Sequence, residues 1–218
     1  GADVVIENFK GGVIERLGYG YEAVRAVKPD IIYCSISGYG QKGPMAGKAA
    51  YDGAIQAASG MMSVTGTPDS GPLRVGYMSV DIPTGLTAAF AIASALFRRG
   101  HTGVGQHLDV AMLDCAMTLL NPNIARYLMT GLTTERMGNA SPTNQGTGDT
   151  WATKDGHIQM TVITDAMTAK MCAAFERADL AKDPRFATTE GRVEYKAEIK
   201  PIIGEILATK TTTEWIAR

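Results

Sequence analysis

The 218-residue chain has few cysteines and no long apolar run, and each absence removes a class of protein. Its three cysteines are odd in number and far apart, at Cys34, Cys115 and Cys172. This pattern is typical of reduced, buried thiols in a cytosolic protein and argues against a disulfide scaffold or a zinc site. No stretch is apolar for long enough to span a bilayer, and the first residues do not resemble a signal peptide. We therefore expect a cytoplasmic protein with no membrane partner.

The sequence also lacks an excess of charge of either sign. Its 21 lysines and arginines nearly balance 22 aspartates and glutamates, which gives a formal net charge of −1. This balance creates no basic field that would attract nucleic acid. Histidine is scarce as well, and His101, His107 and His157 have no partners at the spacing of metal ligands. We therefore expect neither a nucleic-acid partner nor a bound metal.

Two short apolar runs, residues 3–7 and 30–37, are rich in β-branched and aromatic side chains. Such runs are typical of strands that are buried on both faces of a parallel sheet. The residues between them, 11–27, have a helical pattern that stops at Lys28-Pro29-Asp30. This strand–helix–strand order predicts an α/β fold with a Rossmann-like parallel sheet. Further patterns predict a strand over 106–110 and helices over 51–62, 82–98 and 111–130, and the apolar composition of 82–98 favours burial on most faces.

The pattern changes at a polar, turn-rich segment near residue 138. Beyond it, Asp155-Gly156 between two alternating segments predicts a β-hairpin, and helical patterns follow. We therefore expect three parts: residues 1–112 form part of a large domain, 113–137 a linker helix, and 138–218 a smaller α+β domain. The chain starts without Met in a strand pattern and stops inside a helix pattern, so we expect a central fragment of a longer protein.

Asp81 is the residue most suited to chemistry. It lies in the run Val-Asp-Ile-Pro-Thr-Gly of residues 80–85, where a loop becomes the helix predicted over 82–98. A carboxylate at such a place caps free backbone N–H groups or points into a cleft as a nucleophile. Judged by this segment alone, capping is favoured, because Asp is a preferred N-cap and Pro is favoured in the first turn.

Seven segments in a fixed order give the sequence a resemblance to a known family. They are residues 6–12 (Ile-Glu-Asn-Phe-Lys-Gly-Gly), 35–44 (Ser-Ile-Ser-Gly-Tyr-Gly-Gln-Lys-Gly-Pro), 51–52 (Tyr-Asp), 80–85 (Val-Asp-Ile-Pro-Thr-Gly), 101–110 (His-Thr-Gly-Val-Gly-Gln-His-Leu-Asp-Val), 138–140 (Gly-Asn-Ala) and 183–186 (Asp-Pro-Arg-Phe). The chain resembles the family III CoA-transferases, which include formyl-CoA and carnitine CoA-transferases. Each segment alone is a weak signal, but the ordered set is specific and extends along nearly the whole chain.

The resemblance implies a Rossmann-like domain that binds CoA, a linker, a small domain, and a homodimer of interlocked subunits. It also implies transfer between an acyl-CoA thioester and a carboxylic acid. In this family an aspartate attacks the thioester, forms a mixed anhydride with the acyl group and releases CoA thiolate, which is later re-esterified. Matching of the motifs assigns this role to Asp81. The chemistry is sound, because a desolvated carboxylate is a competent nucleophile for an activated thioester.

The candidate CoA-binding residues follow the first predicted strand and precede the helix predicted over 51–62. Open α/β sheets bind ligands at the carboxyl ends of their strands, and lysine and arginine suit phosphate groups. For Arg16, an exposed position on a helix face is an equally good interpretation. By resemblance, the CoA-binding residues are Asn8, Phe9, Lys10, Arg16, Lys48, Tyr51 and Asp52.

Two alternative functions stay open. The α-methylacyl-CoA racemases of the same superfamily use an aspartate and a histidine, and the histidine would fall where this chain has Tyr51. Tyrosine is a poor base at neutral pH, so a transferase is favoured. The other alternative is a truncated, non-catalytic domain that only oligomerises or binds CoA. Residues 144–149 differ from the glycine-rich loop of formyl-CoA transferases, which argues against formate and oxalate as substrates.

Overall fold

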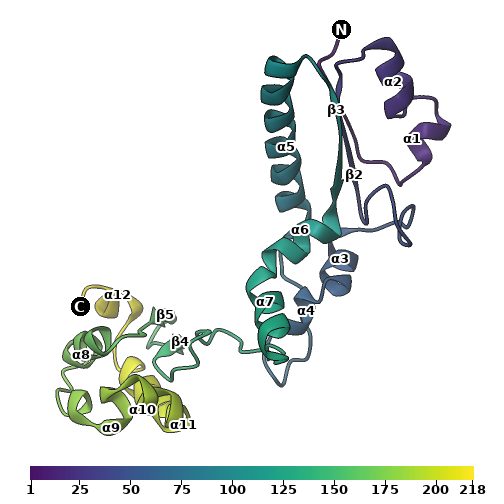
Figure 1. Cartoon of the computed structure of the whole chain (residues 1–218). Coiled ribbons are helices and arrows are strands. Elements are labelled where there is room, and N and C mark those ends of the chain that lie inside the picture. Colours follow the sequence, from purple (N-terminus) through teal and green to yellow (C-terminus); the bar gives the residue numbers. More distant parts are fainter. The chain divides into compact units, whose positions relative to one another are not determined.

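The computed structural model describes residues 1–218, which separate into two compact units, Gly1–Arg136 and Met137–Arg218 (Figure 1). The division lies close to the boundary predicted at residue 138. None of the helices has the length and apolar character that crossing a membrane requires. How the two units correspond to the domains of a longer protein stays a prediction.

The first unit is built on a parallel sheet with strand order β1-β2-β3. The strands are β1 (Val4–Glu7), β2 (Ile32–Ser37) and β3 (Gln106–Ala111). Glu7 pairs with Ser35 and Ser35 pairs with Asp109, so the three strands end at the same edge of the sheet. The predicted α/β fold class, with its parallel sheet, is confirmed.

Two short helices, α1 (Val13–Arg16) and α2 (Tyr21–Val27), cover one face of this sheet (Figure 1). A single helix was expected over 11–27, but the chain breaks at residues 18–20, where Gly18 adopts a φ of +85°. Such an angle is strained for other residues and ends a helix. On this face the hydroxyl of Tyr33 donates to the carbonyl of Tyr19 at 2.8 Å, which ties the sheet to the turn between the two helices.

Helix α5 (Asp81–Thr102) covers the opposite face of the sheet (Figure 1). Its small residues face inward, and Ala88 packs with Cys34 and Val110 of the strands. Its large side chains point the other way, so that Leu86 is 68% and Phe90 76% exposed. The prediction of burial on most faces is therefore wrong in this chain. Composition revealed an apolar helix, but only one of its faces has a partner here.

Four further helices extend the first unit beyond the carboxyl edge of the sheet. The predicted helix over 51–62 is two helices, because Gly60 adopts a φ of +85° between them. The expected linker helix over 113–137 is also two helices, and Leu120 lies between them. The two helices within 113–137 belong to the first unit, because Met112 and Leu120 share a buried core with Ile55. These helices are α3 (Asp52–Ala58), α4 (Met61–Val64), α6 (Met112–Leu119) and α7 (Asn121–Thr130).

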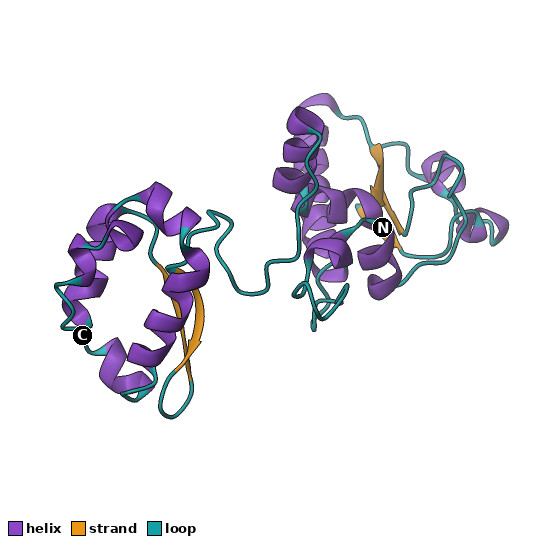
Figure 2. Ribbon diagram, turned by 90° about the horizontal axis from the view of Figure 1, so that it is seen from below, coloured by secondary structure: helices purple, strands orange, loops and turns teal.

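The second unit combines a β-hairpin with helices (Figure 2). The hairpin joins β4 (Gly148–Ala152) to β5 (His157–Thr161), as the Asp-Gly turn predicted. A single core of ten buried residues, among them Trp151, Phe186 and Ile203, fills its interior. Its helices are α8 (Asp165–Ala174), η1 (Leu180–Lys182), α9 (Pro184–Ala187), α10 (Thr189–Glu194), α11 (Lys196–Leu207) and α12 (Thr212–Ile216).

A fully buried arginine, Arg192, fastens the segments of the second unit together. Its guanidinium donates to Gln145 Oε1, to the carbonyl of Phe186 and to Asp165 Oδ1, each at 2.7 Å. A buried guanidinium is tolerated only when its donors find acceptors, and three separate segments supply them here. The segment around Gln145, which was compared with the glycine-rich loop of formyl-CoA transferases, is therefore held firmly within the unit.

Candidate active site

The loops that follow β1 and β2 meet beyond the carboxyl edge of the first-unit sheet. A side chain at Gly11 would place its Cβ 3.1 Å from the backbone nitrogen of Gly47, so the two loops touch there. A side chain at Gly38 would collide with Ala50. The approach at Gly38 requires glycine, because a Cβ there would overlap the Cβ of Ala50, and the approach at Gly11 is tight. They bring the segment after β1 beside the segment that leads into α3.

Asp81 begins α5 at this end of the sheet and is an exposed residue whose carboxyl is only partly shielded from solvent. The N-cap residue of α5 is Val80, and no side chain of the helix's own first turn accepts a capping hydrogen bond. Asp81 therefore does not cap its own helix, which was the structural alternative to a chemical role. Its carboxylate is left free for another partner.

The surroundings raise the pKa of the Asp81 carboxyl above its usual value. The first cause is partial burial, which disfavours the charged form, and the second is repulsion by the Asp52 carboxylate. Within a series of related nucleophiles, the more basic anion attacks faster, as thiolates illustrate. Asp81 is thus a more basic carboxylate than an ordinary surface aspartate.

Asp52, the neighbour that repels Asp81, is itself only 5% exposed. Its Oδ2 accepts hydrogen bonds from the backbone N–H of Val80 at 2.8 Å and of Asp81 at 3.1 Å. Its Oδ1 accepts from Gln56 Nε2 at 2.5 Å. By resemblance Asp52 is a candidate CoA-binding residue, and this stays a prediction; in the structure its carboxylate accepts from donors of the protein itself. The side chain does not lie at the surface, where a ligand would meet it.

The other predicted CoA-binding residues do lie at the surface. Tyr51 is 81% exposed at the start of α3, directly before Asp52. Phe9 is 48% exposed, and its backbone N–H donates to the carboxylate of Glu7 at 2.8 Å, which fixes the turn after β1. The structure therefore presents exposed candidate residues in two segments, the one after β1 and the one that leads into α3. The exposed candidates are Asn8, Phe9, Lys10, Arg16, Lys48 and Tyr51.

Three residues of this region were not singled out from the sequence: Glu7, Gln56 and Arg74. Gln56 is fully buried and bonds to Asp52, and the i, i+4 spacing of these two on a helix is a signal that the sequence contains. Glu7 is buried at the end of β1, and its Oε1 has no hydrogen-bond partner. Arg74 lies against Gly53 of α3 and contributes positive charge near Asp52. No local pattern couples Arg74 to α3, because a loop separates them.

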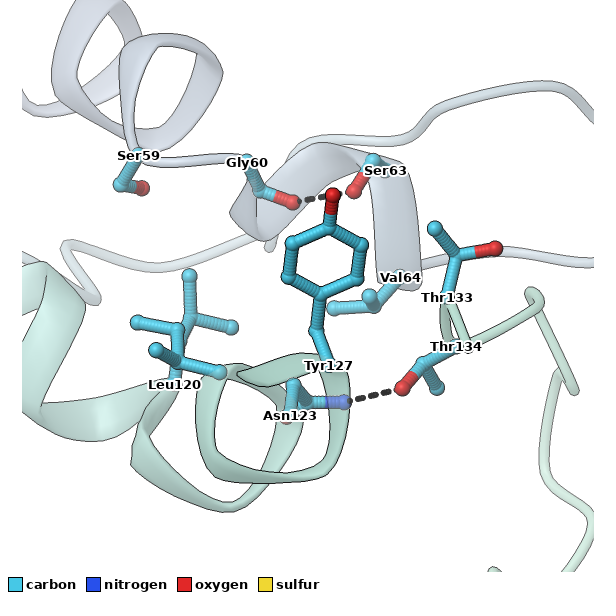
Figure 3. Close-up of a pocket in the computed structure, with 10 residues that line it drawn as sticks. Ser59, Gly60, Ser63, Val64, Leu120, Asn123, Tyr127, Thr133 and Thr134 are labelled. Carbon is cyan, nitrogen blue, oxygen red and sulfur yellow. Dashed lines mark hydrogen bonds between the residues drawn. The ribbon is translucent and has the colours of Figure 1, made fainter. Parts of the chain in front are cut away.

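A pocket of about 360 Å³ lies elsewhere in the first unit, beside the junction of α3 and α4 (Figure 3). The ring of Tyr127 stands in it, and Asn123 Nδ2 donates to Thr134 Oγ1 at 3.1 Å along its wall. Its lining contains no charged side chain and none of the candidate residues described above. The pocket is therefore separate from the candidate active site. Nowhere in the chain do three or more His, Cys, Asp or Glu side chains gather in a way that could hold a metal ion.

Comparison with known proteins places these observations in a family. Residues 1–218 match the family model described as CoA-transferase family III. A succinate–glutarate CoA-transferase of Agrobacterium fabrum is 41% identical over 202 residues, which are 93% of this chain and 50% of that protein. An acetyl-CoA:oxalate CoA-transferase of Acetobacter aceti is 36% identical over 216 residues, 99% of this chain and 55% of that protein.

A solved structure agrees with these matches. The crystal structure of a CAIB/BAIF family protein from Brucella suis is similar with a TM-score of 0.89 and 40% sequence identity. The similarity covers 99% of this chain and 57% of that one. The chain thus spans about half the length of the curated relatives it matches.

Proposed function

Because the chain belongs to CoA-transferase family III, we propose that the protein containing it moves CoA from an acyl-CoA thioester to a carboxylic acid. The observation that carries this proposal is Asp81, a carboxylate at the start of α5 that bonds to no other group, does not cap its own helix and has a raised pKa. The names of two relatives, with succinate, glutarate and oxalate, support short dicarboxylic acids as the class of substrate. Oxalate is thereby a candidate again, although residues 144–149 differ from the loop of formyl-CoA transferases.

In the proposed reaction, an oxygen of the Asp81 carboxylate attacks the thioester carbonyl carbon. The carbon–sulfur bond breaks with its electron pair on sulfur, giving CoA thiolate and an aspartyl mixed anhydride. The acceptor carboxylate then attacks the aspartyl carbonyl carbon and displaces the donor acid as its carboxylate. Finally, the retained thiolate attacks the acyl carbon of the acceptor, which forms the new thioester and frees Asp81. No step transfers a proton, so the site needs no general base.

We propose that the exposed residues after β1 bind the CoA moiety. Lys10 and Arg16 offer a point charge and a planar fork for phosphate groups, and Lys48 extends this cationic surface. Phe9 presents an exposed aromatic face to a flat group. Tyr51 stands next to Asp52 at the start of α3, and we propose that it contacts the substrate near the reacting carbonyl.

We also propose a homodimer of interlocked subunits in the cytoplasm. All three cysteines are free and buried, which supports a reducing compartment. The large apolar side chains exposed on α5 and α7, among them Phe90 and Leu128, support further packing against more protein.

The proposal is tested by trapping the anhydride in the full-length protein with hydroxylamine during turnover with succinyl-CoA and glutarate. We expect a hydroxamate at Asp81 by mass spectrometry, and no such adduct in Asp81→Asn. Transfer should fall by at least about 10⁴-fold in that variant, as is typical when a nucleophile is removed. Asp69→Asn is the matched control, because Asp69 is an exposed aspartate of a loop and bonds to no other side chain.

Two results would contradict the proposed reaction. If the Asp81→Asn variant transfers CoA at the rate of the unchanged protein, Asp81 is not the nucleophile. Exchange of the α-proton of an acyl-CoA with deuterium from solvent, without CoA transfer, would instead identify a racemase.

A further inference from the structure

The starts of helices α3 and α5 are joined by a single buried carboxylate, that of Asp52. It accepts the backbone N–H groups of Val80 and Asp81, although Asp81 lies 29 residues further along the chain. The first turn of a helix leaves N–H groups without intrahelical partners, and a preceding side chain usually satisfies them. Val80 is the residue at that preceding position, and its side chain carries no hydrogen-bond acceptor. Asp52 therefore supplies the capping acceptor from another helix.

Gln56 completes this connection from one turn further along α3. It is fully buried, and its Nε2 donates to Asp52 Oδ1 at 2.5 Å. Its Oε1 accepts the backbone N–H of Val75 at 2.8 Å. The segment from Val75 to Asp81 is therefore tied to α3 at both ends through one pair of side chains. Buried polar networks whose members are all satisfied rigidify the surrounding backbone.

From this geometry we infer that Asp52, held by Gln56, is a positioning residue that fixes the backbone of Asp81 and sets its reactivity, and that it does not contact CoA. The inference rests on the proposed role of Asp81 as the nucleophile. It changes the role of Asp52 from the CoA-binding one that the sequence predicted.

The charges of the two carboxylates support this division of roles. Burial alone would raise the pKa of Asp52, but the hydrogen bonds from Gln56, Val80 and Asp81, with the nearby charge of Arg74, lower it. Asp52 therefore keeps its negative charge. That charge adds to the effect of desolvation in raising the pKa of Asp81. One aspartate stays ionised inside the protein, while the other becomes a more basic anion at the surface.

The test uses two variants that separate charge from hydrogen bonding. Asp52→Asn removes the charge but keeps an oxygen that can accept from Val80 and Asp81. Its new NH₂ group then faces the NH₂ group of Gln56, so two donors oppose each other. Adding Gln56→Glu restores an acceptor at that contact and still accepts from Val75. The double variant thus keeps every hydrogen bond, with the negative charge one helical turn further away.

We measure kcat and the KM for acyl-CoA across pH in the full-length protein, with Asp69→Asn as the control. In Asp52→Asn we expect kcat to fall by about 100-fold, because the nucleophile is displaced, while KM changes little. The acid limb of kcat/KM should move to lower pH, because the repulsion that raises the pKa of Asp81 is gone. The double variant should recover about tenfold of the lost kcat, the value of one restored hydrogen bond, and keep the displaced acid limb.

A raised KM for acyl-CoA with unchanged kcat and pH profile would overturn the inference and return Asp52 to the CoA site. An acid limb at the same pH in all variants would overturn it as well. If Asp52→Asn does not fold, the double variant decides by the position of its acid limb. Failure of the proposed function is seen separately, because Asp81→Asn would then keep its activity whatever the Asp52 variants do.

Discussion

The two units differ in how completely they cover their own apolar side chains. The second unit, Met137–Arg218, has one core of ten residues and exposes only Met167, Val193 and Ile216 among its large apolar residues. The first unit, Gly1–Arg136, divides its core into two smaller clusters and exposes twenty such residues. The candidate active site therefore belongs to the unit that is less complete by itself. Large exposed apolar patches mark surfaces that contact other protein, a membrane or a ligand.

The exposed apolar side chains of the first unit are most regularly spaced on α5. Ile82, Leu86 and Phe90 follow one another at a spacing of four residues, and all are more than half exposed. Residues at this spacing lie on the same face of a helix. Since the relatives are about twice as long as this chain, we expect their remaining residues, or a second subunit, to pack against this face.

Separating the two units should give the largest difference. We expect residues 137–218 alone to unfold in one cooperative transition, because their core is complete. Residues 1–136 alone should bind the dye ANS and melt without a sharp transition, because their apolar surface lies open. Circular dichroism and dye fluorescence measure both. A sharp transition of residues 1–136 without dye binding would break the comparison.

A matched pair of phenylalanines sharpens the comparison at the level of single side chains. Phe186 of the second unit is fully buried, so Phe186→Ala should cost about 3–5 kcal/mol of unfolding free energy. Phe90 of the first unit is 76% exposed, so Phe90→Ala in residues 1–218 should change it by less than about 0.5 kcal/mol.

Urea unfolding measures both changes in unfolding free energy, and Phe90→Ala is also measured in the full-length protein. If Phe90→Ala loses much more unfolding free energy in the full-length protein than in residues 1–218, further protein covers α5. Equal costs in the two proteins would show that the face stays open.

Sequence patterns predicted the parts of this structure that depend on local spacing. The three parallel strands, the start of α5 and the Asp155-Gly156 hairpin all follow from periodicity and turn residues. The patterns also placed Asp81 where a loop becomes a helix, but its local sequence favoured a capping role that the structure does not show.

The features that the sequence did not predict depend on contacts between distant segments. Nothing near Asp52 indicates that its side chain caps a helix that begins 29 residues later. The burial of α5 was overestimated for a related reason, since an apolar helix does not specify which of its faces finds a partner. Breaks at Gly18 and Gly60 were missed because a single glycine is tolerated within many helical patterns.

The smallest expected effect is on the stability of the second unit at acid pH. In the second unit, a hydrogen bond from the Arg185 side chain is the main cause that lowers the pKa of Asp183 below 3.8. A carboxyl with a lowered folded-state pKa adds stability above its unfolded value, and this stability is lost as the pH falls through the folded value. The melting temperature of residues 137–218 should therefore drop between about pH 5 and about pH 2.

Asp183→Asn should flatten this drop slightly, because asparagine still caps α9 but no longer titrates. Asp69→Asn cannot serve here, since it lies in the other unit, so Glu205→Gln on an exposed helical position is the control. An equal drop in the Asp183→Asn variant would show that other carboxyls govern acid unfolding of this unit.

Tyr51 and Asp52 are neighbours in the chain but meet opposite surroundings. The first is 81% exposed, whereas the second is 5% exposed and holds the backbone at Asp81. An exposed side chain can be exchanged without disturbing the interior, while a buried one cannot. The side chain at position 51 can thus change while the hydrogen bonds that hold the backbone of Asp81, the proposed nucleophile, stay in place. A replaceable surface residue and a fixed buried one are therefore adjacent in the chain.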